Sequence, residues 1–400
     1  MSGIACSVSR AIIIPARSEY EWLRQTIHSL EQNPIEECRK TLVLVVVNGP
    51  APDKNKADYH RRLEIQKDNS QTLDFLSNHK PITTLNLAWI DCASPGREMA
   101  DNKGVGLARK IGTDSVLNSI YGQFEQFPHE NQVEMNKFVI LHLDADTLVE
   151  NNYMATTSQE LLHNCTPGAV INYKHRITST DRMEKESGEA YEIYLQYYVL
   201  GLEYAGSPYA FHAIGSTMCS TAAGYVKAGG IPAKRLAGED FYFLQEMQKA
   251  GGVSHITGTT VYPSARLANK APFGTGTAIE NMKHSGTFEM PVYPPEVFVV
   301  LRNMLECVTA NIHLQPEEIL SRLDAPSAAE FLKQHSFVET MEKLQQNNPN
   351  RTQQLIKAFH NWFDALKTFR FIRTLSDTDA YPGKPLNTAR QELNHLLHKK

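Results

Sequence analysis

The first 260 residues alternate short apolar runs with longer amphipathic stretches. Apolar runs rich in β-branched residues are typical of strands that are buried on both faces of a sheet. We expect such strands at 11–15, 41–47, 84–90, 138–143, 168–173 and 253–257. The intervening stretches predict helices at 19–32, 54–77, 104–121, 183–202 and 239–250. This alternation predicts an α/β fold with a mixed, mostly parallel sheet flanked by helices.

The pattern changes at three prolines, Pro291, Pro294 and Pro295. Beyond them the chain is rich in Gln, Lys and Leu and keeps a helical period to its end. Four hundred residues also exceed the usual size of one hydrophobic core. We therefore expect an α/β domain over residues 1–290 and a C-terminal helical region over residues 291–400. The tyrosines spaced along the 183–202 helix predict packing rather than a platform for a sugar.

Composition argues against several classes of protein. Hydrophobic residues make up 42% and charged residues 21% of the chain, as in ordinary soluble proteins. The formal net charge of −4 and the lack of a long basic run argue against nucleic-acid binding. No apolar window has the length of a transmembrane segment, which leaves peripheral membrane contact open. The absence of a signal peptide and six scattered cysteines without a Cys-x-x-Cys pair favour a cytoplasmic location. Composition indicates no oligomeric state.

Two carboxylates follow the fourth apolar run. Asp144 and Asp146 stand directly behind this run and flank Ala145. Ligands of open α/β sheets bind at the carboxyl ends of the strands. One carboxylate can ligate Mg²⁺ or Mn²⁺ while the other contacts the group that carries the phosphates. The alternative is a strand followed by an acidic turn, since Asp is common in turns.

Two upstream segments have residues that suit an anionic ligand. The segment 14–19 follows the first strand, and its Arg17 can stack on a base or pair with a phosphate. The alternative is that this segment only caps the following helix. The segment 102–112 follows the third strand and combines small residues with Lys103 and Arg109 at the start of a helix. The alternative is a flexible loop that enters a basic helix.

Two downstream segments suit catalysis and phosphate contact. Glu239 and Asp240 begin a helix, where they act either as an acidic cap or as a general base for an acceptor hydroxyl. Arg266 and Lys270 precede a Gly-rich turn. Such a loop could clamp a diphosphate or close over the site, and the alternative is an ordinary surface loop.

In their order along residues 10–260, these segments resemble the family-2 glycosyltransferases of the GT-A fold. The resemblance rests on Ile-Pro-Ala-Arg-x-Glu, a second strand, Asn-x-Gly-x-x-x-Ala-Arg-x-x-Gly, Asp-x-Asp, and then Gly-Gly and Glu-Asp. Two positions depart from the family pattern. Asn48-Gly49-Pro50 stands where Asp-Asp-Gly-Ser is common, and Lys110 stands where Asn is frequent. A Gln-x-x-Arg-Trp motif is missing, which argues against a processive synthase.

The resemblance assigns a nucleotide-binding role to one group of residues. These are Pro15, Ala16, Arg17, Glu19, Asn48, Gly104, Arg109 and Asp144. Within this group Asn48 would face the base, and Asp144 would lie nearer the ribose. Lys103, Arg266 and Lys270 add positive charge for the phosphates of the nucleotide-sugar.

The resemblance also assigns the metal and the chemistry. Asp146, with Asp144 beside it, would hold Mn²⁺ or Mg²⁺, and His255 or His284 would supply a further ligand. Asp240 would be the catalytic base, and Glu239 would help to orient the acceptor.

The implied activity is metal-dependent transfer of a sugar from a nucleotide-diphospho sugar donor to the hydroxyl of an unidentified acceptor. The transfer would invert the anomeric centre and would not be processive. The segment 212–217 would lie toward the acceptor. Two other interpretations stay open, a sugar nucleotidyltransferase and a non-catalytic binding protein with a degenerate site. The Gly-rich signature that a nucleotidyltransferase carries after its first strand is missing.

Overall fold

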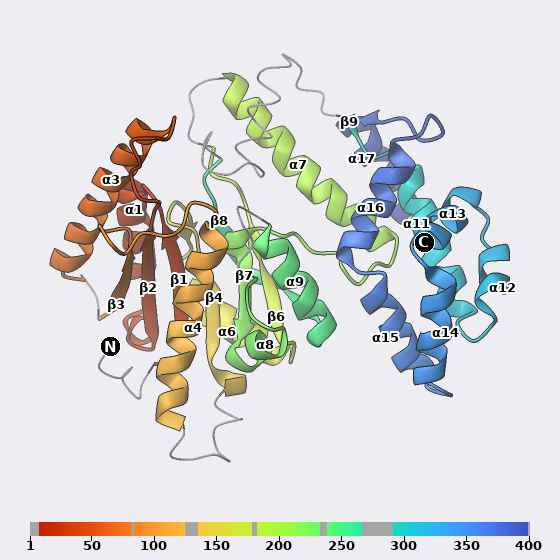
Figure 1. Ribbon diagram of the computed structural model, residues 1–400, viewed down its shortest axis with the longest axis horizontal. Coiled ribbons are helices and arrows are strands. Elements are labelled where there is room, and N and C mark those ends of the chain that lie inside the picture. Colours follow the sequence, from red (N-terminus) through yellow and green to blue (C-terminus); the bar gives the residue numbers. More distant parts are fainter. Residues whose placement is uncertain are drawn as a thin grey trace. The chain divides into compact units, whose positions relative to one another are not determined.

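The computed structural model describes residues 8–81, 84–124, 135–177, 182–232, 238–265 and 291–398. Within it the chain divides into two compact units (Figure 1). The first unit contains residues 1–188 and 213–280, and the second contains residues 189–212 and 281–400. The domain boundary expected near residue 290 stays a prediction. The greater part of the long helix at 182–204 belongs to the second unit.

The first unit is built on an eight-stranded sheet with the order β3-β2-β1-β4-β7-β6-β8-β5. Its strands are β1 Arg10–Ala16, β2 Thr41–Asn48, β3 Asn86–Cys92, β4 Val139–His142, β5 Leu148–Val149, β6 Gly168–Tyr173, β7 Met218–Thr221 and β8 Val253–Tyr262. The β1–β2, β1–β4, β2–β3 and β6–β8 pairs are parallel. The β4–β7, β6–β7 and β5–β8 pairs are antiparallel. The predicted fold class, a mixed and mostly parallel sheet flanked by helices, is confirmed.

The parallel strands β1 to β4 all end at one edge of this sheet. The register pairs Ile13 of β1 with Leu44 of β2 and with His142 of β4. β2 is buried over its whole length, as its run of Val and Leu residues predicts. The chain leaves β1 at Arg17, and it reaches Asp144 just beyond β4. Residues distant in sequence therefore meet at this carboxyl edge.

Helices pack on both faces of the sheet. The helices that begin in this unit are α1 Tyr20–Glu31, α2 Ile35–Arg39, α3 Tyr59–Asn78, α4 Val105–Phe124, α6 Tyr153–His163, α7 Arg182–Tyr204, α8 Ala222–Lys227 and α9 Glu239–Ala250, with the short 3-10 helix η1 Gly215–Thr217. A Cβ at Gly112 of α4 would lie 2.6 Å from Ile13 of β1. A Cβ at Gly168 of β6 would lie 2.5 Å from Met247 of α9. Both helices therefore press directly on the sheet.

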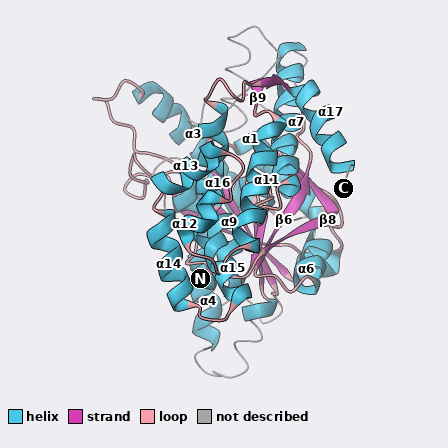
Figure 2. Cartoon of the chain, turned by 90° about the vertical axis from the view of Figure 1, so that its right-hand side faces the viewer, coloured by secondary structure: helices cyan, strands magenta, loops and turns pink. Residues whose placement is uncertain are grey.

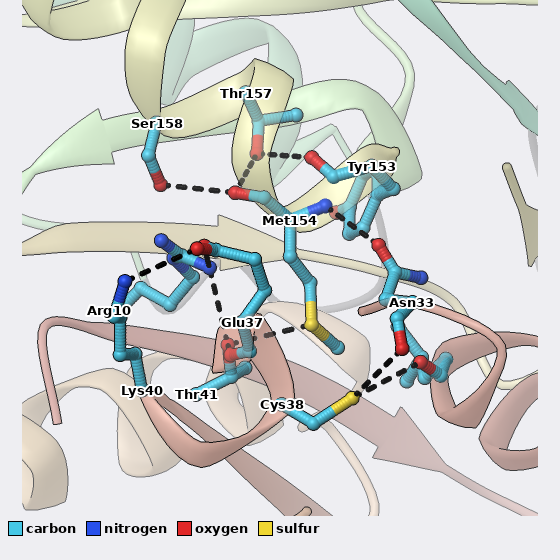
Figure 3. Close-up of polar contacts among 11 residues, drawn as sticks. Arg10, Asn33, Glu37, Cys38, Lys40, Thr41, Tyr153, Met154, Thr157 and Ser158 are labelled. Carbon is cyan, nitrogen blue, oxygen red and sulfur yellow. Dashed lines mark hydrogen bonds and ion pairs between the residues drawn. The ribbon is translucent and has the colours of Figure 1, made fainter. Parts of the chain in front are cut away.

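A polar network fastens the opposite, amino-terminal end of the strands (Figure 3). Arg10, the first residue of β1, donates a hydrogen bond of 2.6 Å to Glu37 of α2. The hydroxyl of Thr41, the first residue of β2, donates to the Glu37 carbonyl at 2.7 Å. Asn33 accepts a hydrogen bond of 3.0 Å from the backbone N–H of Met154 in α6. These bonds join α2, α6 and two strands at the end of the sheet opposite the carboxyl edge.

The second unit is almost entirely helical (Figure 2). The sequence predicts this helical character for the C-terminal region. Its elements after α7 are β9 Pro291–Val292, α11 Pro295–Ala310, α12 Pro316–Ser321, α13 Pro326–Gln334, α14 Phe337–Asn347, α15 Thr352–Trp362, α16 Ala365–Ser376, β10 Lys384–Pro385 and α17 Leu386–His398. Tyr197 of α7 and Phe298 of α11 are fully buried, with ring centroids 5.8 Å apart. Packing by the Tyr-rich helix is thus confirmed. Among the described helices, none has the length and apolar character needed to cross a membrane.

Replacement of Gly112 by Ala tests the packing of α4. The new methyl group would meet Ile13 at 2.6 Å and Val46 at 3.0 Å, and both side chains are fully buried. We expect Gly112→Ala to lower the free energy of unfolding by about 1–3 kcal/mol, as overpacking does. Urea denaturation followed by circular dichroism measures the change. In the control Gly188→Ala the added methyl group meets Ile177 at 3.4 Å and Ala265 at 3.6 Å, which are ordinary contact distances. Equal stability of the two variants would contradict the packing described.

Candidate active site

The turn that carries Asp144 and Asp146 is held by its own backbone. The N–H of Thr147 donates to the Asp144 carbonyl at 3.1 Å. The hydroxyl of Thr26 in α1 donates to the Ala145 carbonyl at 2.8 Å. Because these bonds use carbonyl groups, they fix the turn without occupying the two carboxylates, which are both half-buried.

The Asp144 carboxylate forms an ion pair with a buried arginine. Arg109 of α4 is 2% exposed. Its Nη2 donates to Oδ1 of Asp144, and its Nη1 donates to Oε1 of Glu239 at 2.5 Å. Burial alone would lower the pKa of Arg109, but the carboxylates of Asp144, Glu239 and Asp240 outweigh it and raise that pKa. The sequence predicts Arg109 beside the nucleotide, whereas the structure buries it between two carboxylates.

The backbone brings Glu239 and Asp240 to this arginine. Gly238, which precedes α9, has φ of +85°, a conformation that glycine adopts without steric cost. The first turn of α9 then lies against α4, because a Cβ at Gly106 would stand 2.9 Å from Cβ of Glu239. The side chain of Glu239 is only 4% exposed, whereas Asp240 is half-buried. Of the two carboxylates, Asp240 is therefore the one that a substrate can reach.

Asp240 has the altered acidity of a proton-transfer group. Burial, followed by the nearby charge of Glu239, raises the pKa of Asp240 to about 7, although Arg109 opposes this shift. One oxygen of Asp240 accepts a hydrogen bond of 2.8 Å from the N–H of Phe241. A carboxyl group that titrates near neutral pH can take a proton from a substrate and release it again.

A buried histidine packs against α9, the helix that begins with Glu239 and Asp240. His142 is fully buried in β4, and its ring packs edge-on against Phe243 of α9, with centroids 6.1 Å apart. Neither ring nitrogen has a hydrogen-bond partner among the described residues. Burial and the charge of Arg109 lower the pKa of His142 to about 3, so its ring is neutral at pH 7.

Residues expected at the nucleotide gather at the ends of β1 and β2. Pro15 and Ala16 are buried within β1. Arg17 is half-buried, and burial, then the charges of Arg61 and Arg62 in α3, lower its pKa. These two arginines were not predicted, since α3 is polar and its sequence is typical of a solvated helix.

Asn48 and Glu19 occupy the same part of the edge. Asn48 is 4% exposed, and its Oδ1 has no partner among the described residues. Its backbone carbonyl accepts a hydrogen bond of 3.1 Å from Asn69 of α3. Glu19 precedes α1 and makes no side-chain hydrogen bond to cap it, which weakens the capping alternative. Lys103 is half-buried, just before α4.

The oxygen donors at the turn suit a cation that is shared with a substrate. Mg²⁺ and Mn²⁺ are commonly held by one or two carboxylates together with phosphate oxygens and water. Asp146 meets this requirement, and Asp144 can do so only in competition with Arg109. Within the described part of the chain, no group of three or more His, Cys, Asp or Glu side chains is arranged as a complete metal site.

The structure does not bring His255 to these carboxylates. β8 pairs His255 with Val170, whereas Arg176, which lies six residues beyond Val170, donates to the Asp146 carbonyl. Six residues of extended chain span about 20 Å. This register argues against His255 as a ligand beside Asp146, and its role as a metal ligand stays a prediction. Arg266, Lys270 and His284 lie outside the described residues.

Comparison with known proteins gives distant structural similarity alone. No protein-family profile matches the chain, and no curated protein matches its sequence. S. aureus TarS 1–349 in complex with UDP-GlcNAc is 15% identical, with a TM-score of 0.37, and the match covers 89% of this chain and 81% of that one. GalNAc-T7 with UDP, GalNAc and Mn²⁺ is 12% identical, with a TM-score of 0.36, over 70% of this chain and 48% of that one. Both matches are to GT-A glycosyltransferases. Likeness at this level is too distant to assign an activity.

Replacement of His142 by Phe tests the buried, neutral histidine. The folded protein takes up a proton at His142 only near pH 3, whereas the ordinary pKa is 6.5. The unfolded state therefore binds more protons between these values, and the free energy of unfolding falls as the pH drops below 6.5. We expect His142→Phe to remove up to about 1.4 kcal/mol per pH unit from this slope. Urea denaturation between pH 7 and 5 measures it, with near-UV circular dichroism as the control for folding. An unchanged slope would contradict the burial of a neutral His142.

Proposed function

We propose that this protein is a glycosyltransferase that uses a nucleotide-diphospho sugar as its donor. The observation that carries the proposal is the position of Asp240. This half-buried carboxyl, with a pKa near neutral, stands beside the ion-paired Glu239 at the carboxyl edge of the sheet. The motif order described above supports the same activity.

The donor is proposed to bind across the ends of β1, β2 and β4. Arg17 offers a cation near the ends of β1 and β2, and Asn48 offers a buried acceptor for the base. Asp146 would hold Mn²⁺ or Mg²⁺, with Asp144 beside it. Such a cation, when bound, neutralises charge on the phosphate oxygens of the donor. Lys103, half-buried before α4, can add a further positive charge.

The reaction is proposed to be a single displacement. The acceptor hydroxyl oxygen forms a bond to the anomeric carbon while the bond from that carbon to the diphosphate oxygen breaks. The hydroxyl proton passes to the carboxylate of Asp240, which later releases it to water. Attack from the face opposite the diphosphate inverts the anomeric centre.

The position of Glu239 supports inversion over a double displacement. A retaining mechanism of that kind needs a second carboxylate that reaches the anomeric carbon as a nucleophile. The side chain of Glu239 is 4% exposed and ion-paired with Arg109. It is therefore poorly placed to act as a nucleophile, and its role in orienting the acceptor stays a prediction.

Replacement of Asp240 by Asn tests the proposed base. The amide keeps the shape of the side chain but cannot accept the proton, so turnover should fall by roughly 10²- to 10⁴-fold while the Kd of the donor changes little. Single-turnover transfer and donor calorimetry measure the two quantities. In the unsubstituted enzyme, kcat/KM should rise with pH through an apparent pKa near 7, because Asp240 must be ionised to act. Asp74→Asn, at an exposed position of α3, is the control. Normal transfer by Asp240→Asn would remove the proposed base.

Replacement of Asp146 by Ala tests the proposed cation site. We expect the loss of Mn²⁺-dependent turnover, since the substitution removes the carboxylate proposed to ligate the cation. Release of nucleoside diphosphate from the donor is the measured product, and Asp379→Ala, at an exposed position of the second unit, is the control. Unchanged metal-dependent release by Asp146→Ala would contradict the site. Formation of pyrophosphate from a nucleoside triphosphate would instead identify a nucleotidyltransferase.

A further inference from the structure

Both terminal nitrogens of Arg109 are engaged by carboxylates. Nη1 donates to Glu239 at 2.5 Å, and Nη2 donates to Asp144. The residue is 2% exposed. Because the side chain is this deeply buried, the guanidinium offers almost no surface to a donor phosphate.

The surrounding backbone fits the guanidinium closely. A Cβ at Gly215 in η1 would lie 2.2 Å from Nη2 of Arg109 and 2.7 Å from its Cζ. A Cβ at Gly106 would lie 2.9 Å from Cβ of Glu239. Real Cβ atoms do not approach other heavy atoms this closely. The packing therefore leaves no room for a side chain at Gly215 or at Gly106. The backbone at Gly215 thus encloses the guanidinium, and the backbone at Gly106 encloses its partner Glu239.

Arg109 joins two segments that have different tasks in the proposed reaction. Asp144 lies 35 residues from it in sequence, on the turn that faces the donor, and Glu239 lies 130 residues from it. Glu239 precedes Asp240, the proposed base, in the first turn of α9. The guanidinium of Arg109 thus links Asp144, on the proposed donor side, to the helix that carries the proposed base.

We infer that Arg109 is a positioning residue, which ties the turn of Asp144 to the first turn of α9 and so sets Asp240 against the donor. The inference rests on the proposed function and deepens it. It gives Arg109 no contact with the donor phosphates. Gly215 belongs to the same arrangement, because only a glycine there leaves space for the guanidinium.

Replacement of Arg109 by Met and by Lys tests the role. Met removes the charge, and Lys keeps it but lacks the planar fork that can serve two carboxylates at once. We expect kcat of Arg109→Met to fall on the order of 10²-fold, as a misplacement of about 1 Å can cause. The donor Kd, measured by calorimetry with Mn²⁺ present, should change less than about threefold, because Arg109 is inferred to make no contact with the donor. A lost phosphate contact would raise Kd about tenfold for each 1.4 kcal/mol of binding free energy. Arg109→Lys should recover part of kcat. A large rise in donor Kd at unchanged kcat would overturn the inference and make Arg109 a phosphate ligand.

Replacement of Gly215 by Ala disturbs the same arginine without removing a charge. We expect Gly215→Ala to lower kcat, as Arg109→Met does. In the Arg109→Met background, Gly215→Ala should lower kcat little further, because the unbranched Met side chain leaves space for the added methyl group. Gly188→Ala, where the added methyl group meets only ordinary contacts, is the control. Fully additive effects of Gly215→Ala and Arg109→Met would contradict the arrangement.

A cycle of unfolding midpoints separates this inference from the proposed function, because it needs no substrate. We expect Arg109→Met to lower the urea midpoint less in the Glu239→Gln background, where one carboxylate fewer is left unpaired. Absence of this coupling in a protein that transfers sugar would refute the inference alone. Absence of any sugar transfer in a protein that shows the coupling would refute the proposed function alone.

Discussion

The ion pairs of Arg109 with Asp144 and Glu239 are the interaction on which the candidate site depends. Three carboxylates, including Asp240, lie around this one buried cation. Without it their mutual repulsion, strengthened by burial, would push the ends of β4 and α9 apart. The close backbone approaches at Gly106 and Gly215 lie directly against Glu239 and Arg109, the partners in these ion pairs.

The arrangement gives neighbouring carboxylates different properties. Glu239 is almost fully buried and ion-paired, whereas Asp240 is half-buried and has a pKa of about 7. A site in which adjacent carboxyl groups differ in this way can keep one as a fixed charge and use the other to move a proton. Asp146, which is also half-buried, is the residue for which we propose a cation shared with phosphates. In the proposed reaction, donor contact and proton transfer are thus assigned to different carboxylates at one edge of the sheet.

Much of the fold could be predicted from the sequence, because the β-branched runs of β1, β2 and β6 and the amphipathic period of α1 are local patterns. The antiparallel strand β7 was missed, since Met218–Thr221 is short and half polar. Its insertion between β4 and β6 depends on tertiary contacts. α6 was missed for a similar reason, because its polar surface hides a weak apolar period.

The candidate site could be predicted only in part. Asp144, Asp146, Glu239 and Asp240 stand out because carboxylates follow a strand or begin a helix. The partner of two of them, Arg109, resembles any basic residue of a helix, and no local pattern shows an ion pair across 130 residues. The position of His255 is set by the β-bulge in β8 and by the register of β8 with β6, and neither is visible in the sequence.

A thermal-shift screen of nucleotide-diphospho sugars, with and without Mn²⁺, tests the central claim most directly. A ligand that binds the folded state raises Tm in proportion to its occupancy. The account predicts that one such donor raises Tm of the full chain in a Mn²⁺-dependent manner, beyond the effect of the metal or of a nucleoside triphosphate. Stabilisation by a nucleoside triphosphate and a sugar phosphate, with no response to any nucleotide-diphospho sugar, would contradict it.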